Sequence, residues 1–186
     1  FESFSLFMES ISEGLMGMLS SGDNLSAISK TVGGDSSAVK SALGMGIPAI
    51  LGSMANNASK PGGLDMLKGM MSKADAANPT GDMAAMLSGG GSAGGSDMLS
   101  GLLGGQLAPI QNAIAKKTGL PASAIGQVLA MIVPMIMAKV SKMFTSQKMD
   151  DKGLTAFLGD QSKMAMQSSP DMADIMKQIT GGAGEK

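Results

Sequence analysis

The chain has 186 residues, a net charge of −1, and fourteen basic residues that are all lysines. It contains no histidine and no cysteine, which excludes disulfides, thiol nucleophiles, zinc sites of the His/Cys kind and a Ser-His-Asp catalytic arrangement. Without arginine or interleaved aromatic residues, it lacks the side chains that usually read or stack on bases. We therefore expect no cofactor, no metal, no catalytic residues and no nucleic-acid partner.

The composition favours helices over sheets. Aromatic residues make up 3% of the chain, while twenty methionines supply much of its apolar content. Few aromatic and β-branched residues disfavour strands, and Ala, Leu, Met and Lys favour helices. We expect an all-α fold, with a compact array of short helices around two long proline-kinked helices.

The first part of the chain begins with a predicted amphipathic helix over residues 2–20, whose apolar face carries Met and Phe side chains. A short helix over 25–32 follows, capped by Asp23 or Asn24. Asp35 or Ser36 then caps the first long helix, at 37–58. A further short helix is predicted at 64–72, and one turn or more at 83–87.

A Gly/Ser-rich segment at 88–96 separates the two parts of the chain. Such a composition is typical of a flexible linker, and the segment lacks the Lys-Ser/Thr ending of a nucleotide-binding loop. We therefore expect a first helical half-domain at 1–87, a linker at 88–96, a second helical half-domain at 97–180 and a flexible tail at 181–186.

The second half contains the most apolar segment of the chain, a helix predicted over 122–144. Two shorter helices, at 97–103 and 107–118, precede it. A turn at 150–153 follows, and then short helices at 154–158, 162–166 and 172–179.

The two halves resemble each other in sequence. A shift of 86 positions places Pro134 on Pro48 without a gap, and other residues then coincide. The matched residues include Ile114 with Ile28, Gly119 with Gly33, Leu129 with Leu43, Met131 with Met45 and Ile136 with Ile50. Because two prolines within matched apolar helices are hard to explain by composition, we predict an internal duplication and an approximate two-fold axis.

Neither long helix has an unbroken apolar run of the ~20 residues that span a bilayer. Gln127 and Lys139 interrupt the second, and glycines dilute the first. We expect no transmembrane span and a soluble protein, cytoplasmic by default. The chain begins at Phe1, which is consistent with a processed product or a fragment.

Two motifs resemble the YidB-like family of bacterial proteins. One covers residues 42–55, and the other covers 119–134, preceded by a Gly-Leu-Leu-Gly-Gly run at 101–105. The resemblance extends from about Leu15 to Leu158. It implies a compact all-helical domain of unknown function, and it brings no catalytic residues to transfer.

Small residues and the proline recur every four positions along each long helix, so they share one helix face. These six candidate site residues are Gly44, Pro48 and Gly52 in the first helix, and Ala130, Pro134 and Ala138 in the second. We interpret them as a stripe where two kinked helices cross, because small side chains let backbones approach closely. The alternative is that the kinks and freed carbonyls shape a ligand groove.

Two other groups of residues could suggest metal binding. Asp150 and Asp151 form the only adjacent carboxylate pair, but without the alternating ligand spacing of a calcium loop. We interpret them as a helix cap or solvated turn. The clustered methionines could in principle bind Cu(I), but they lie on apolar helix faces and are better explained as core.

These observations predict a non-enzymatic helical interaction or assembly protein. It would act through Met-rich apolar surface, by binding a protein partner or by self-association. The alternative is a peripheral membrane or lipid-binding module that uses the Met/Phe face of residues 2–20.

Overall fold

The computed structural model describes residues 16, 17, 19, 22–77, 95–170, 174, 175 and 177. These residues form helices joined by short turns, and no strand occurs among them. The predicted all-α fold class is therefore confirmed. Most of the predicted 2–20 helix, the turn at 83–87, most of the linker and the tail lie outside the described residues.

Three helices follow one another in the first half: α3 (Gly22–Val32), α4 (Ser36–Ala58) and α5 (Gly63–Ala77). Asp35 is the N-cap of α4, and its carboxylate accepts hydrogen bonds from the backbone N–H groups of Ser37 and Ala38. Gly33 has a φ of +74°, and its N–H donates to the Ser29 carbonyl, which ends α3 as a left-handed glycine commonly does.

The second half begins with α7 (Gly95–Leu103), a 3-10 turn η1 (Gly104–Gln106) and α8 (Leu107–Thr118). They lead to α9 (Ala122–Ser146) and α10 (Asp151–Ser168). Gly119, with a φ of +81°, ends α8 and leads into the turn before α9. α7 begins two residues before the predicted helix start at 97, within the last residues of the predicted linker.

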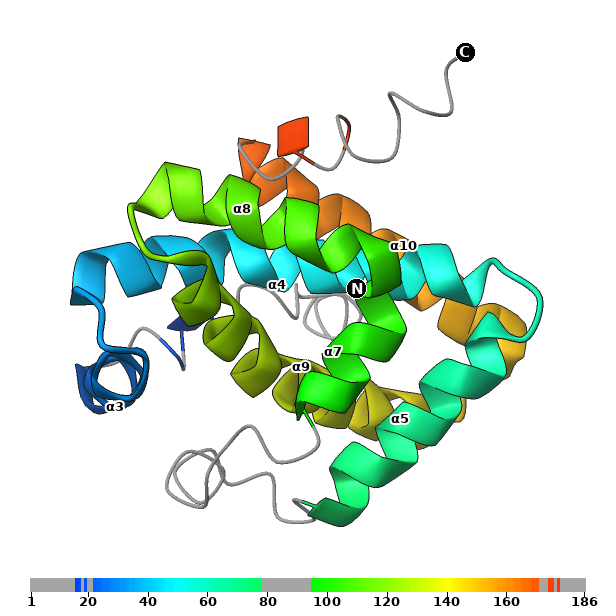
Figure 1. Ribbon diagram of the computed structural model, residues 1–186. Helices are drawn as coiled ribbons and strands as arrows, with labels where there is room; N and C mark the ends of the chain where they lie inside the picture. Colours follow the sequence, from blue (N-terminus) through cyan, green and yellow to red (C-terminus); the bar gives the residue numbers. More distant parts are fainter. Residues whose placement is uncertain are drawn as a thin grey trace.

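The two long helices occupy the middle of the molecule, as predicted from their apolar sequences. α8 and α10 pack along α4, while α5 and α7 pack on α9 (Figure 1). The centre of α9 is enclosed, because every residue from Val128 to Ala138 is buried. Such helices are apolar on all sides because neighbours cover all sides.

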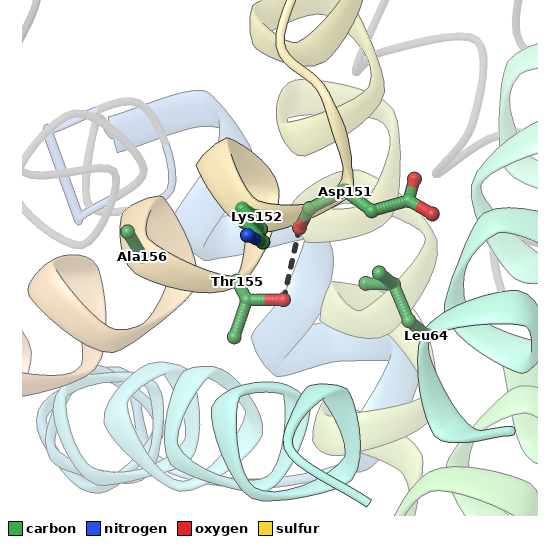
Figure 2. Close-up of a pocket in the computed structure, with 5 residues that line it drawn as sticks. All are labelled: Leu64, Asp151, Lys152, Thr155 and Ala156. Carbon is green, nitrogen blue, oxygen red and sulfur yellow. Dashed lines mark hydrogen bonds between the residues drawn. The ribbon is translucent and has the colours of Figure 1, made fainter. Parts of the chain in front are cut away.

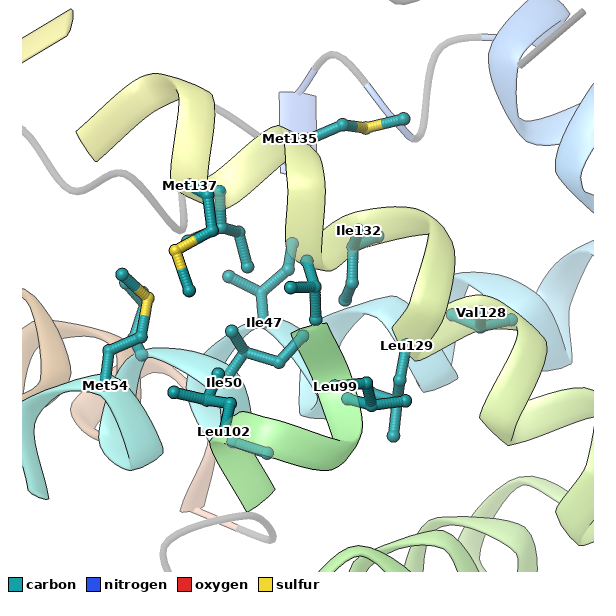
Figure 3. Packing of buried hydrophobic residues seen from close by; sticks show 14 of the residues in the cluster. Ile47, Ile50, Met54, Leu99, Leu102, Val128, Leu129, Ile132, Met135 and Met137 are labelled. Carbon is teal, nitrogen blue, oxygen red and sulfur yellow. The ribbon is translucent and has the colours of Figure 1, made fainter. Parts of the chain in front are cut away.

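Aliphatic and Met side chains fill the space between α4, α7 and α9. Figure 3 shows Ile47 and Ile50 of α4 facing Leu129 and Ile132 of α9, with Leu102 of α7 beside them. All five are at most 4% exposed. The contacts between the two halves are therefore made in the centre of the core.

One helix differs from its prediction. The sequence predicted separate short helices at 154–158 and 162–166, but α10 is continuous from Asp151 to Ser168. Gly159, in its middle, lies between the two predicted helices. The helix continues through it because Leu154, Leu158 and Ala165 on one face are fully buried, and α10 packs on α4.

Candidate functional site

The structure places the six predicted stripe residues in or beside the core. Pro48, Ala130, Pro134 and Ala138 are buried, and Gly44 and Gly52 are half-buried. A β-carbon at Gly44 would lie 3.9 Å from Met16 Cε, which is ordinary contact distance. Contact between the two stripes themselves stays a prediction.

The glycine that lies closest to α9 in the described residues is Gly46, which the sequence analysis did not single out. A β-carbon there would lie 2.8 Å from Leu129 Cδ2 and 3.2 Å from Ile132 Cδ1. A side chain at Gly46 would therefore have to displace the ends of the Leu129 and Ile132 side chains. The sequence offered both Gly44 and Gly46 as candidates for a close helix approach. Only Gly44 lies four residues from Pro48, so the spacing argument selected it and left Gly46 out.

A shallow, open hollow lies where the start of α5 meets the start of α10. Its volume is about 450 Å³, and it is lined by Leu64, Asp151, Lys152, Thr155 and Ala156. Figure 2 shows Leu64 on α5 opposite the side chains along the first turns of α10. The surface that lines the hollow is almost wholly apolar, with the charged groups of Asp151 and Lys152 nearby.

An ion pair joins the two halves beside this hollow. Lys68 of α5 pairs with Asp151 of α10, and its ammonium lies 5.9 Å from the centroid of the Phe144 ring. The hydrogen bond with Asp151 raises the pKa of Lys68 above its ordinary value; desolvation opposes this, and the charges of Asp151 and Asp65 add to it. Because both side chains are well exposed, the pair orients the two helices more than it stabilises them.

Hydrogen bonds fix the first turn of α10 at the edge of the hollow. The Asp150 carboxylate accepts from the Gly153 N–H at 2.7 Å, which confirms its predicted role as a helix cap. The Thr155 hydroxyl donates to the Asp151 carbonyl at 3.0 Å (Figure 2). Asp150 is therefore a cap and Asp151 an ion-pair partner, in the first turn of α10.

The side chain of Asn57, at the end of α4, was also missed by the sequence analysis. Its Nδ2 donates to the Ser53 carbonyl and to the Leu102 carbonyl, each at 2.8 Å. Leu102 lies in the last turn of α7, where carbonyls have no partner within the helix. Asn57 therefore ties α4 to the end of α7, a role that no local pattern predicts.

The lining of the hollow combines apolar surface with one hydroxyl and two charged side chains. Its only hydroxyl, that of Thr155, donates to the Asp151 carbonyl, and the Asp151 carboxylate is paired with Lys68. An open, apolar depression flanked by opposite charges can accept an apolar side chain from a partner. In the described part of the chain, no group of three or more acidic side chains could hold a metal ion.

The methionines that the structure describes do not gather on an apolar surface. Every methionine whose exposure the structure describes is buried or half-buried. Met54, Met131 and Met137, for example, are at most 3% exposed. A flexible, unbranched side chain suits an irregular core with few aromatic residues. Within the described residues, the methionines lie in the core or pack against it, and no methionine lines the hollow.

Both central helices are long and apolar enough to cross a membrane, judged by length and composition alone. Whether either helix spans a membrane is not settled by these properties, and the absence of a span stays a prediction. Within the fold, 67% of the most apolar window of α4 and 78% of that of α9 are buried by the rest of the chain. Core helices of soluble proteins have the same properties, so these features are weak evidence for a span.

A family model described as bacterial protein of unknown function (DUF937) matches residues 14–143. No curated protein and no solved structure matches the chain.

Proposed function

The chain belongs to this bacterial family, which includes YidB as the sequence resemblance predicted, and we propose that it is a non-enzymatic helical protein that binds another protein or a second copy of itself. The absence of His and Cys from the whole sequence supports the non-enzymatic part of this proposal.

The observation that carries the proposal is the hollow between α5 and α10. Its apolar lining, the Lys68–Asp151 pair and the exposed Lys152 provide an apolar contact surrounded by charge. Interfaces between proteins commonly have this arrangement, with an anchoring side chain at the centre and polar groups at the rim. Its open shape fits a protruding side chain better than an enclosed small molecule.

We further propose that the chain arose by internal duplication. The order of a short helix, a long proline-containing helix and a third helix occurs as α3, α4 and α5 and again as α8, α9 and α10. The packing is reciprocal, because α5 packs on α9 while α10 packs on α4. Both features support two equivalent halves, in which the third helix of each half packs on the long helix of the other.

Two close approaches support a two-fold axis between these halves. The shift of 86 positions pairs Gly34 with Leu120 and Gly46 with Ile132. A β-carbon at Gly34 would lie 2.6 Å from Leu120 Cδ2, and one at Gly46 would lie 3.2 Å from Ile132 Cδ1. If a two-fold axis relates the halves, a residue can touch its own counterpart only near that axis, so both close approaches support the proposed axis.

The proposed bends at the prolines belong to the same arrangement. Pro48 and Pro134 both lie inside continuous helices. Each removes the backbone hydrogen bond to the carbonyl four residues earlier, which is Gly44 in α4 and Ala130 in α9. We propose that both helices bend there and cross near Gly46, which places the two stripes beside the crossing.

The membrane alternative rests on the apolar face predicted for residues 2–20. Leu19, at the end of that segment, is fully buried, and Met16 is half-buried beside Gly44. Leu19 is therefore turned into the protein, and Met16 is partly covered by it. The alternative therefore depends on Phe4, Phe7 and Met8, which lie outside the described residues.

A photo-crosslinking amino acid at Ala156 in the full chain tests the proposed function in bacterial cells. We expect protein adducts when it replaces Ala156 in the hollow, and far fewer when it replaces the exposed Ser123 at the start of α9. Adding Leu64→Asp to the first variant should remove the adducts. Equal labelling at both positions would refute a binding role for the hollow.

Vesicle sedimentation separates the two candidate functions. With neutral and anionic phospholipid vesicles, the proposal predicts that the full chain stays in the supernatant. Sedimentation with the vesicles that is lost on replacing Phe4 and Phe7 by Ser would favour the membrane alternative instead.

A further inference from the structure

Each half of the chain completes its packing on the other half. α10 packs mainly on α4, and α5 packs mainly on α9. The three α10 side chains Leu154, Leu158 and Ala165 are fully buried in the described fold. Because the third helix of each half covers the long helix of the other, neither half encloses its own apolar surface alone.

Specific contacts also join the halves. Asn57 of α4 donates to the Leu102 carbonyl of α7, and Lys68 of α5 pairs with Asp151 of α10. A β-carbon at Gly101 of α7 would lie 3.0 Å from Met70 Cε of α5. None of these contacts depends on whether the two halves belong to one chain or to two.

The chain connection between the halves runs through residues 78–94, which link the end of α5 to the start of α7. This stretch includes Pro79 and a Ser-Gly-Gly-Gly-Ser-Ala-Gly run from Ser88 to Gly94. Seventeen residues can span at most ~60 Å when fully extended. The connection therefore decides which second half is within reach of a given first half.

We propose that the self-association partner is a second copy of this chain, bound by exchange of halves. The first half of one copy then packs on the second half of the other through the α4/α10 and α5/α9 contacts. Joining the two halves in one chain favours the closed monomer, because each half is always near its partner half. A shorter linker, or a high protein concentration during folding, favours the exchanged dimer.

Shortening the linker tests this exchange directly. Deletion of residues 79–93 leaves two residues between α5 and α7, which can reach no more than ~10 Å. Light scattering should then give about twice the mass of one chain, with helical circular dichroism retained. Insertion of ten Gly/Ser residues at the same place is the control and should not favour the dimer. A folded, monomeric deletion variant would overturn the proposal.

Co-refolding of two full-length variants tests the exchange of halves if the shortened chain does not fold. Val39 and Ile125 are equivalent, fully buried residues of the two halves. An aspartate at either position buries an unpaired carboxylate and should unfold the chain. Mixed and refolded together, Val39→Asp and Ile125→Asp chains can form one undamaged pair of halves. We expect cooperative unfolding and about half of the helical signal to return, while a mixture that stays unfolded overturns the exchange.

The exchange rests on the proposed function, but it can fail separately. If crosslinking at Ala156 captures a partner while both exchange experiments give a negative result, the hollow binds a different protein. If the exchange occurs and Ala156 captures nothing, the chain self-associates through its core helices without the hollow.

Discussion

Gly63 begins α5 at a point where the backbone passes close to the end of α4. Its N–H donates to the Lys60 carbonyl at 3.0 Å, and a β-carbon at this position would overlap the carbonyl oxygen of Asn57. Backbone atoms cannot move aside as a flexible side chain can. The turn between α4 and α5 therefore requires a residue without a side chain.

We predict that Gly63→Ala lowers the free energy of unfolding by about 3 kcal/mol or more, the upper range for overpacking. Urea denaturation followed by circular dichroism measures the change. Gly69→Ala in the same helix is the matched control, since Gly69 is exposed and has no atom near its missing β-carbon. It should be neutral or stabilising by up to ~1 kcal/mol. Equal effects of the two substitutions would contradict this account of the turn.

Gly46 tests the crossing of the two central helices. Gly46→Leu forces its side chain against Leu129 and Ile132, and we expect a loss of ~1–3 kcal/mol or more. The stripe predicts a similar loss for Ala130→Leu. Lys139→Leu, at an exposed position of α9, should change the urea midpoint little. An unchanged urea midpoint for Gly46→Leu would show that α4 and α9 do not approach closely at Gly46. An unchanged midpoint for Ala130→Leu alone would show that the stripe is not at the contact between the two helices.

The hydrogen bond from Asn57 to Leu102 acts between helices. Replacing Asn57 by Ala removes a donor shared by two carbonyls, one of them at the end of α7. We predict a loss of ~1–2 kcal/mol and faster hydrogen exchange at the amides of α7. Asn56→Ala, at the exposed neighbouring position, is the control. Unchanged exchange in α7 would show that other contacts fix this helix.

The sequence predicted the long helices well because their signals are local and strong. The predicted 37–58 and 122–144 agree with α4 and α9 within two residues at each end. The predicted 64–72 fell short of α5, which continues to Ala77 through Lys73 and three alanines. Alanine favours helix intrinsically, but an apolar-periodicity argument does not count such residues as part of an amphipathic helix.

The candidate site could not be predicted in the same way. The hollow combines Leu64 with Asp151, which are far apart in sequence, and the Asn57 bond reaches α7 across the fold. The four-residue spacing pointed to Gly44, whereas Gly46 makes the close approach, because the crossing geometry depends on how α9 packs against α4. Composition correctly indicated an aliphatic, Met-rich core, but it could not tell which Met residues reach the surface.

We propose that the whole molecule consists of two equivalent halves related by a two-fold axis. Any duplication makes corresponding distances within the two halves equal. Only a two-fold axis also makes reciprocal distances between the halves equal. The exposed residues Lys30 and Ser41 in the first half correspond to Lys116 and Gln127 in the second.

Pulsed electron paramagnetic resonance on spin-labelled cysteine pairs measures these distances, and the chain has no native cysteine to interfere. The two-fold axis predicts that the distance from position 30 to 127 equals the distance from 116 to 41. The distances 30–41 and 116–127 within the halves should also agree. Equal distances within the halves with clearly unequal distances between them would contradict the two-fold axis and leave only a duplication.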